Sequence, residues 1–262
     1  LISYKKSFLR SSNMNVSNPY YSKPKIVSNT EIKKFSFSNF SDRFDEHISN
    51  SIRGYSSLKE DVVSISKYFV EDHTTVLDIG CSEGTLIKQI LDKNDQSTQS
   101  EYIGVDINDD FKGHWTNTDR IKYLIDDITT MSFPKNCSFI TSLFTLQFLS
   151  ERDRPTLFRK VFNSLVVGGG FVLSEKLLSD DGKTQNMMDF LYYDFKRSNF
   201  SEQEILDKEV ELRHLSKSIS EQQLLNQLKS VGFSKIQTFW RNFNFVGLVC
   251  FKPYQNEIGG SV

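Results

Sequence analysis

The ten residues VLDIGCSEGT, at positions 76 to 85, constrain the fold of this chain more than any other stretch. A short apolar run meets Asp78, and Gly80 and Gly84 follow at the spacing D-x-G-x-x-x-G. The apolar run is typical of a buried strand. Gly80 permits a sharp turn of the backbone, and Gly84 permits close approach of the helix that follows. The stretch therefore predicts a strand, a tight turn and a helix, which begin a parallel α/β sheet.

Apolar strands and helical segments continue to alternate along the chain. Strands are also predicted in EYIGVDIN, IKYLIDDI, CSFITSLFTLQFL and GFVLSEKL, and a closing hairpin in KIQTFWRNFNFVGLVCFKP. The helix ERDRPTLFRKVFNSL is expected to stop at the glycines 168–170, before the fifth strand. Strands that are apolar throughout indicate a mostly parallel sheet covered on both faces, and the hairpin indicates an antiparallel edge. We expect a Rossmann-like α/β fold with a seven-stranded sheet.

The two ends of the chain differ in composition from its middle. Residues 1–34 are rich in Ser, Asn and Lys and are expected to form a flexible arm, and residues 254–262 a flexible tail. The domain between them, residues 35–253, is expected to begin with a helical cap, because apolar side chains recur every four residues from Phe40 to Ile52. Residues 184–230 are expected to be a mostly helical insertion before the closing hairpin.

Composition excludes several classes of function. The net charge of −1 gives no overall positive field that would attract nucleic acid or an acidic membrane. The three cysteines, at 81, 137 and 250, have no metal-ligand spacing, and their odd number argues against a disulfide framework. No apolar run approaches the roughly 18 residues that span a bilayer. These features predict a cytoplasmic protein with no metal and no membrane partner.

Carboxylates stand at the ends of three successive predicted strands, as Asp78, Asp106 and Asp127. In a parallel sheet such ends meet where ligands bind. Asp78 would repel a pyrophosphate, and the glycine turn lacks both a complete G-x-G-x-x-G and a G-K-[ST]. A sulfonium and an ammonium would be attracted, so S-adenosylmethionine is the predicted cofactor, with Asp106 on the ribose and Asp127 and Ile128 at the adenine. If the glycine turn is considered without the other acids, the alternative is an ordinary strand-to-helix turn that binds no ligand.

Taken together, these segments resemble class I S-adenosylmethionine-dependent methyltransferases, and within them the carboxy-S-adenosylmethionine synthases. The resemblance covers roughly residues 35 to 252, in FDEHISNSIRGY, DIGCSEGT, FTLQFL, VLSEK, DFKRSNFSEQEI and FWRNFNF. FTLQFL, SEK and DFKR are together more specific than the glycine turn. That family makes carboxy-S-adenosylmethionine from prephenate and S-adenosylmethionine, for modification of the tRNA wobble uridine.

The resemblance implies a cofactor role for each position that matches the family. Tyr55 and the turn at 80–82 would hold the methionine end, residues 106–107 the ribose, and residues 127–128 the adenine. With the residues argued from the strand ends and the position before FTLQFL, the predicted cofactor-binding set is Tyr55, Asp78, Gly80, Cys81, Ser82, Gly84, Asp106, Ile107, Asp127, Ile128 and Leu143.

Two positions depart from the family pattern. Leu143 stands where the family has Asn, and Glu209 stands where the family has the Arg that pairs with the carboxylate added to the cofactor. A Glu there presents a like charge and loses bidentate pairing, and Lys208 or Arg213 is a possible replacement. The preferred function is therefore a diverged S-adenosylmethionine-dependent transferase, of the methyltransferase class, with catalytic residues and acceptor unassigned.

Other interpretations stay open at this stage. The chain could be a carboxy-S-adenosylmethionine synthase acting on prephenate, or a non-catalytic cofactor-binding partner subunit, and a homodimer is possible. Glu175 and Lys176 follow the fifth strand and either face the site or form an ion pair. Lys196 and Arg197, in DFKR, are expected on a solvated charged face of a helix.

Overall fold

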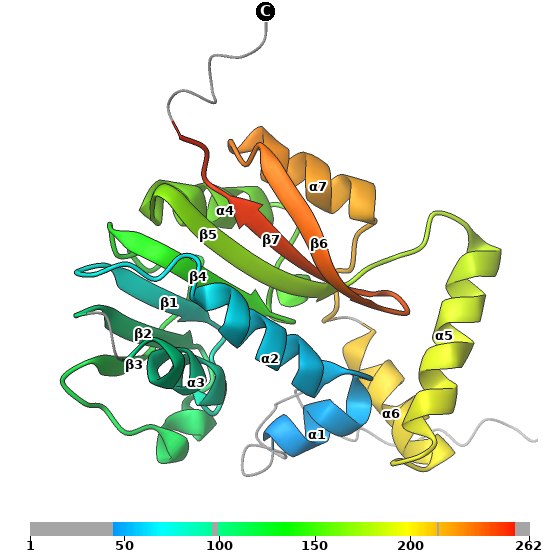
Figure 1. Ribbon diagram of the computed structural model, residues 1–262. Helices are drawn as coiled ribbons and strands as arrows, with labels where there is room; N and C mark the ends of the chain where they lie inside the picture. The colour runs from blue at the N-terminus through cyan, green and yellow to red at the C-terminus, as the bar shows by residue number, and fades with distance from the viewer. Residues whose placement is uncertain (1–43, 96–98, 214, 255–262) are drawn as a thin grey trace, which may run out of the picture. The chain divides into compact units, whose positions relative to one another are not determined.

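The computed structural model describes residues 44–95, 99–213 and 215–254, in which seven strands form one sheet (Figure 1). The strand order is β3-β2-β1-β4-β5-β7-β6. All neighbours pair in parallel except β5 with β7 and β6 with β7, as predicted for a closing hairpin. The strands are β1 Thr75–Ile79, β2 Glu101–Asp106, β3 Ile121–Ile125, β4 Cys137–Leu143, β5 Leu165–Lys176, β6 Lys235–Asn242 and β7 Phe245–Phe251.

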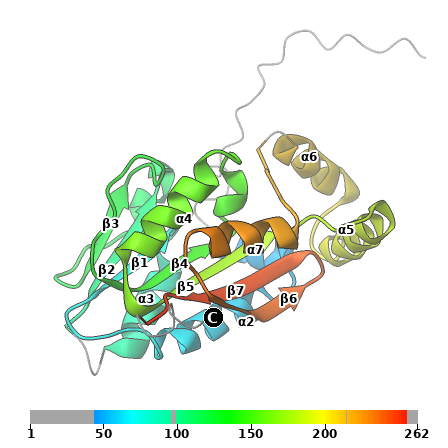
Figure 2. The ribbon, with the colours of Figure 1, turned by 90° about the horizontal axis from the view of Figure 1, so that it is seen from above.

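Helices cover both faces of this sheet, because its central strands are apolar on both sides. In Figure 2, α2 and α3 lie on one face, and α4 and α7 lie on the other. Two apolar cores result, one around Leu58 and Ile87 and the other around Phe158 and Leu224. The helices are α1 Phe44–Ser51, α2 Tyr55–Ser66, α3 Thr85–Asn94, α4 Asp153–Ser164, α5 Gly182–Lys196, α6 Glu202–Leu212 and α7 Glu221–Ser230.

The predicted helical insertion is confirmed as α5, α6 and α7. Ser201 and Ser220 begin α6 and α7 with capping boxes, in which each Ser hydroxyl accepts from the third helical residue. Helices α5 and α6 lie beyond the end of the sheet at which β1, β2 and β4 finish (Figures 1 and 2). Helices α5 and α6 therefore stand over the edge where ligands bind in folds of this kind, while α7 covers a face of the sheet.

The expectation that the glycines 168–170 stop a helix was wrong. Helix α4 already ends at Ser164, and the glycines lie inside β5. A Cβ on Gly170 would be 2.7 Å from the ring of Phe69, which packs over the strand just after α2. The glycine is needed for this close approach of an aromatic ring, and not for ending a helix.

Predictions for the chain ends lie mostly outside the described residues. The structure does not describe the arm at 1–34, the cap residues before Phe44, or the tail beyond Tyr254. Within the described part, Phe44–Ser51 is helical as predicted. No helix among the described residues is long and apolar enough to cross a membrane.

Candidate functional site

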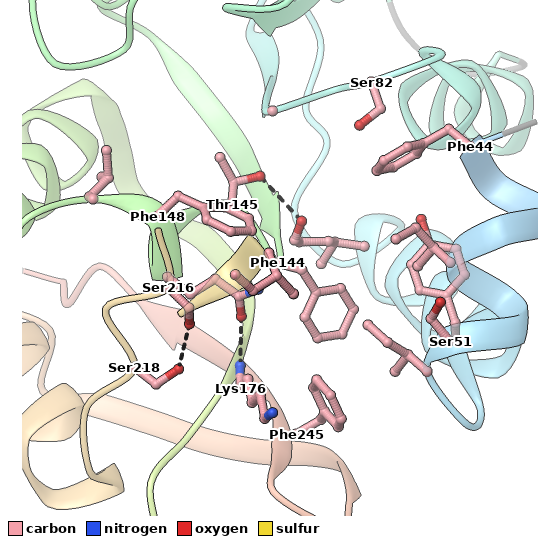
Figure 3. A pocket seen from close by; sticks show the side chains of 18 of the residues that line it. Phe44, Ser51, Ser82, Phe144, Thr145, Phe148, Lys176, Ser216, Ser218 and Phe245 are labelled. Carbon is pink, nitrogen blue, oxygen red and sulfur yellow. Dashed lines mark hydrogen bonds between the residues drawn. The ribbon is translucent and has the colours of Figure 1, made fainter. Parts of the chain in front are cut away.

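A cavity of about 800 Å³ lies at the carboxyl ends of the parallel strands. Its lining comes from the ends of β1, β2, β4 and β5, from α1 and the start of α2, and from α5 and α6. Figure 3 shows side chains from these distant segments, including Phe44, Ser82, Phe144 and Lys176, turned toward one space. The cavity has an acidic side, at the glycine turn, and a side rich in lysine, at α5 and α6.

The glycine turn is held tightly against its neighbours. Gly80 has φ +75°, and its N–H and that of Cys81 both donate to Val105 O, at 2.8 and 3.0 Å. Thr145, from FTLQFL, occupies the space where a side chain on Gly80 would stand, because a Cβ there would be 2.7 Å from Thr145 Cγ2. The turn therefore presents backbone to the cavity at a place where only glycine fits.

Asp106 braces this turn from β2. Its two carboxylate oxygens accept from Ser82 N and Asn108 N, each at 2.9 Å. Burial raises the pKa of Asp106, and the backbone hydrogen bonds oppose that rise. The carboxylate keeps further acceptor capacity on the cavity side, since each oxygen carries two lone pairs.

Asp78 is the most buried of the strand-end acids, with 2% of its surface exposed. Thr141 Oγ1 donates to its Oδ1 at 2.7 Å. Burial raises its pKa to about 7, and the Thr141 hydrogen bond and Lys59 act against this rise. A cation in the cavity would favour the ionised form, so Asp78 is suited to a ligand group that carries positive charge.

The third acid is turned partly toward its own loop. Thr129 N and Oγ1 both donate to Asp127 Oδ1, at 2.8 and 2.7 Å, and these bonds lower its pKa. Lys160 of α4 donates to Thr129 O at 2.6 Å and Met131 O at 3.0 Å, which holds the loop after β3. The loop presents Ile128 to the cavity.

The lysine-rich side forms around Tyr192 of α5. Lys176 Nζ and Lys196 Nζ lie 4.8 and 4.9 Å from the centroid of its ring. Lys196 is 3% exposed, and burial lowers its pKa to about 8, while Glu209 acts in the opposite direction. Lys208 also lines the cavity, and its charge reaches Lys196.

The prediction of a solvated DFKR face was therefore wrong for Lys196. Arg197 is on the surface, where it donates to Asp194 at 2.6 Å, but Lys196 faces the cavity. Sequence reasoning also missed Tyr192, although its spacing of four from Lys196 places both on one helix face. The open question about Glu175 and Lys176 is resolved: Lys176 lines the cavity, and Glu175 forms a buried ion pair.

The predicted cofactor-binding residues are brought together with one exception. Gly84 does not line the cavity. It caps α3 with φ +76°, and a Cβ there would be 2.8 Å from Tyr123 Oη. The remaining members all line it: Tyr55, Asp78, Gly80, Cys81, Ser82, Asp106, Ile107, Asp127, Ile128 and Leu143. Among the described residues, no group of three or more His, Cys, Asp or Glu could hold a metal ion.

Known proteins match this chain in sequence. A methyltransferase domain model matches residues 76–169. A carboxy-S-adenosyl-L-methionine synthase of Staphylococcus epidermidis is 33% identical over 222 residues, covering 80% of this chain and 92% of the relative. The chain belongs to the carboxy-S-adenosyl-L-methionine synthase family. A family member from Actinobacillus succinogenes is 32% identical over 222 residues, covering 82% of this chain and 91% of the relative.

Solved structures support the fold of this synthase family member. Human N-acetylserotonin methyltransferase in complex with S-adenosylmethionine has a TM-score of 0.57 at 17% identity, covering 83% of this chain and 56% of that one. A Haemonchus contortus N-methyltransferase with S-adenosylhomocysteine has a TM-score of 0.57 at 14% identity, covering 84% and 61%. The class I methyltransferase fold predicted from the sequence is confirmed.

The family and its fold confirm S-adenosylmethionine as the predicted cofactor. The cavity fits it on its own geometry: a glycine backbone where a Cβ would collide with Thr145, and a buried carboxylate, Asp78, that favours a cation. The methionine end would lie at the glycine turn near Asp78 and Tyr55. We propose, as the sequence predicted, that the ribose lies on Asp106 and Ile107 and the adenine at Asp127 and Ile128.

The ribose assignment predicts the effect of changing Asp106. Asp106→Ala should bind S-adenosylhomocysteine about tenfold to a hundredfold more weakly, because charge-assisted hydrogen bonds contribute about 1.5–3 kcal/mol. Isothermal calorimetry measures the affinity, and the matched control is Asp109→Ala, an exposed acid that does not line the cavity. Equal affinities of wild type and Asp106→Ala for S-adenosylhomocysteine would show that Asp106 does not bind the cofactor.

Proposed function

We propose that this chain catalyses the reaction that names its relatives, forming carboxy-S-adenosyl-L-methionine from S-adenosylmethionine and an anionic co-substrate of the prephenate type. The observation that carries the proposal is the pair of lysines, Lys176 and Lys196, whose ammonium groups both lie within 5 Å of the centroid of the Tyr192 ring in the cavity. Two ammonium groups beside one phenol ring, partly out of water, favour an anion close to them. A methyl acceptor needs no such pair.

The charges around Glu209 support the same proposal. The sequence alone suggested that Glu209 would repel a carboxylated cofactor. In the cavity its charge is felt by Tyr192 and Lys196, and Lys176 and Lys208 line the same side. The cations that line this side are Lys176, Lys196, Lys208, Arg213 and Lys217, and they outnumber the carboxylates of Asp153, Asp189 and Glu209, so this side is net positive. An anionic group is therefore attracted even though the family arginine is absent.

Each side of the cavity would have a distinct task in the reaction. The bound cofactor supplies a methyl group activated by its positively charged sulfur. The strand-end acids would hold its cationic and ribose groups, and the lysines would bind carboxylate and orient the co-substrate. The enclosing helices would exclude water, which strengthens these charge interactions.

Substitution of Lys196 tests the proposal. Wild type is incubated with S-adenosylmethionine and prephenate, and the carboxylated product is measured by mass spectrometry. Lys196→Met should raise KM for prephenate at least tenfold, with cofactor affinity unchanged and with Lys196→Arg less affected. The matched control is Arg197→Met, because Arg197 is the neighbouring exposed cation. If wild type binds the cofactor but forms no carboxylated product, the proposal fails.

Methyl transfer is the second candidate, and Glu209 and Leu143 are the observations that favour it. A carboxylate at about 4 Å from another, with an effective dielectric near 20, is repelled by about 4 kcal/mol. On this reading, wild type prefers S-adenosylmethionine to its carboxy derivative, and Glu209→Arg shifts the preference toward the carboxy form. Competition binding with both compounds decides: tighter binding of the carboxy form by wild type would support the synthase.

The same proposal includes a homodimer. Helices α5 and α6 carry exposed apolar side chains at helical spacing, which would suit a protein contact. They are Met187, Phe190, Leu191, Leu206 and Val210. Light scattering after size-exclusion chromatography measures the mass, and a monomer at micromolar concentration would contradict the proposed homodimer.

The non-catalytic alternative has its own test. Cofactor binding without turnover of any acceptor would favour a cofactor-binding partner subunit over an enzyme.

A further inference from the structure

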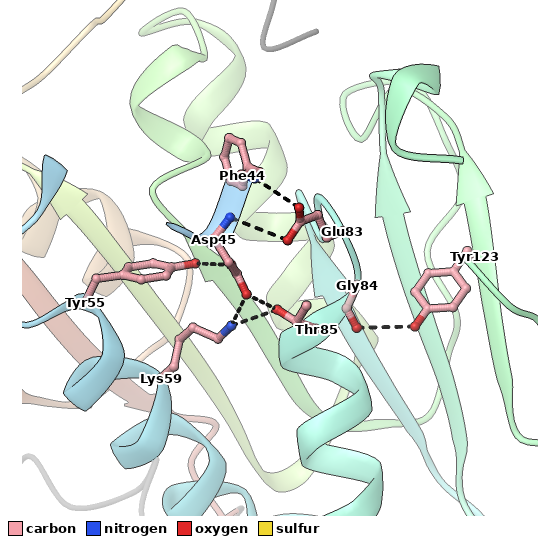
Figure 4. Close-up of polar contacts among 8 residues, drawn as sticks. All are labelled: Phe44, Asp45, Tyr55, Lys59, Glu83, Gly84, Thr85 and Tyr123. Atoms are coloured by element: carbon pink, nitrogen blue, oxygen red, sulfur yellow. Dashed lines mark hydrogen bonds and ion pairs between the residues drawn. The ribbon is translucent and has the colours of Figure 1, made fainter. Parts of the chain in front are cut away.

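Helix α1 bridges the two sides of the cavity. At its start, Phe44 N and Asp45 N donate to the carboxylate of Glu83 in the glycine turn, at 2.9 and 3.4 Å (Figure 4). Toward its other end, Asn199 Nδ2 donates to Asn50 O at 3.2 Å, from the segment that joins α5 to α6. The helix therefore touches both the cofactor side and the lysine-rich side.

The inward face of α1 forms part of the cavity wall. Phe44, His47, Ile48 and Ser51 all line the cavity. Gly54 follows the helix with φ +79°, between α1 and α2. Helix α1 thus supplies one wall of the cavity, and a glycine between two helices can absorb a rotation that moves this wall away from a bound ligand.

Asp45 fastens α1 to the elements beneath it. Lys59 Nζ lies 2.7 Å from Asp45 Oδ2, and Thr85 Oγ1 donates to the same oxygen at 2.6 Å. Lys59 also donates to Thr85 Oγ1 at 2.7 Å, which closes a three-membered ring of contacts. Tyr55 Oη donates to Asp45 Oδ1 at 3.3 Å (Figure 4). One carboxylate thus joins α1 to α2 and α3.

Burial divides the roles within this ring. The Lys59 side chain is 9% exposed and does not line the cavity, whereas the Asp45 side chain is 31% exposed and does. Lys59 therefore acts on a ligand indirectly, through the cavity-lining residues that it contacts, Asp45 and Thr85. The charge of Lys59 also acts on Asp78, so its ammonium lies among the carboxylates of the methionine end.

We infer that α1 is the lid of the cofactor cavity, and that the ring of Asp45, Lys59 and Thr85 is its latch. Lys59 is a positioning residue: it holds Asp45, and through Asp45 it holds Tyr55 and α1 over the methionine end. The inference rests on the proposed cofactor site. Opening requires Asp45 to leave a buried ammonium, so the latch controls how fast a bound cofactor is released.

Hydrogen exchange without ligand tests the latch independently of the proposed function. In Lys59→Met, amides of residues 46–51 should exchange about tenfold faster than in wild type, while those of β1 and β4 stay unchanged. Lys59→Arg should retain slow exchange, because it keeps a cation beside Asp45. The matched control is Lys67→Met, which removes an exposed lysine at the end of the same helix, α2.

Stopped-flow release of S-adenosylhomocysteine supplies the second measurement. The dissociation rate should rise about tenfold in Lys59→Met and in Asp45→Asn, and no further in the double variant, because both changes open one latch. The latch would be overturned if the effects of Lys59→Met and Asp45→Asn on the dissociation rate were fully additive in the double variant. Unchanged hydrogen exchange of α1 in Lys59→Met would also overturn it. A wild type that binds no S-adenosylhomocysteine, with fast α1 exchange still seen in Lys59→Met, would instead overturn the cofactor site and leave the latch standing.

Discussion

Arg154→Met should lose about 3–5 kcal/mol of the free energy of unfolding, because it leaves a buried carboxylate without its partner. Arg154 of α4 and Glu175 of β5 both have fully buried side chains, and Arg154 Nη1 lies 2.8 Å from Glu175 Oε2. Arg154 Nη2 also donates to Lys217 O at 3.2 Å. The pair thus ties α4 and β5 to the segment before α7, and Glu175 directly precedes Lys176, which lines the cavity. Urea unfolding followed by circular dichroism measures the loss.

Two further variants separate the charge from the packing. Arg154→Met with Glu175→Leu should recover most of the stability, since apolar pairs replace buried ion pairs at little or no cost. Arg159→Met, which removes an exposed arginine from the same helix, should change stability by less than about 0.5 kcal/mol. Equal losses in Arg154→Met and in the double variant would show that packing, and not the unpaired charge, accounts for the effect.

The stability lost in Arg154→Met should depend on pH, and the pKa of Glu175 gives the sign. Burial raises the pKa of Glu175 from its ordinary 4.5 to about 7, and Arg154 works against that rise. A folded pKa above the unfolded one contributes stability that is complete below pH 4.5 and is lost as the pH rises through 7. Without Arg154 the folded pKa is higher still. The free energy of unfolding lost in Arg154→Met should therefore be larger at pH 8 than at pH 6.

Gly80→Ala should destabilise the protein by about 2–6 kcal/mol and abolish measurable cofactor binding. The backbone at φ +75° costs a non-glycine residue about 1–3 kcal/mol, and the new Cβ would collide with Thr145, for a further 1–3 kcal/mol. Relieving the collision moves either the turn or the first residues after β4, and both line the cavity. Thermal melting and calorimetry with S-adenosylhomocysteine measure the two effects.

Matched changes identify the cause. Gly182→Ala, at the start of α5, should be neutral, because a Cβ there meets nothing within 4 Å. Gly80→Ala with Thr145→Gly removes the collision but keeps the backbone strain, so it should recover only part of the stability. A Gly80→Ala protein that binds S-adenosylhomocysteine as wild type does would show that the turn does not carry the cofactor.

The sequence by itself determined the sheet, its closing hairpin and the acidic side of the cavity. Asp78, Asp106 and Asp127 follow three apolar runs, and the carboxyl ends of neighbouring parallel strands must meet at one edge. Their proximity therefore follows from local patterns alone. The glycines that permit the turn are visible in the sequence, but the contacts that hold it come from Val105 and Thr145, which are distant in the chain.

Only the tertiary structure decided the other half of the site. Lys176 ends a strand and Lys196 lies on a helix twenty residues later; the spacing of Tyr192 and Lys196 fits a solvated helix face as well as a cavity wall. Packing of α5 and α6 over the strand ends buried Lys196 and put Glu209 among lysines. The contact of Lys59 with Asp45 likewise joins two helices. Contacts between separate elements depend on how whole helices pack, which no short-range periodicity records.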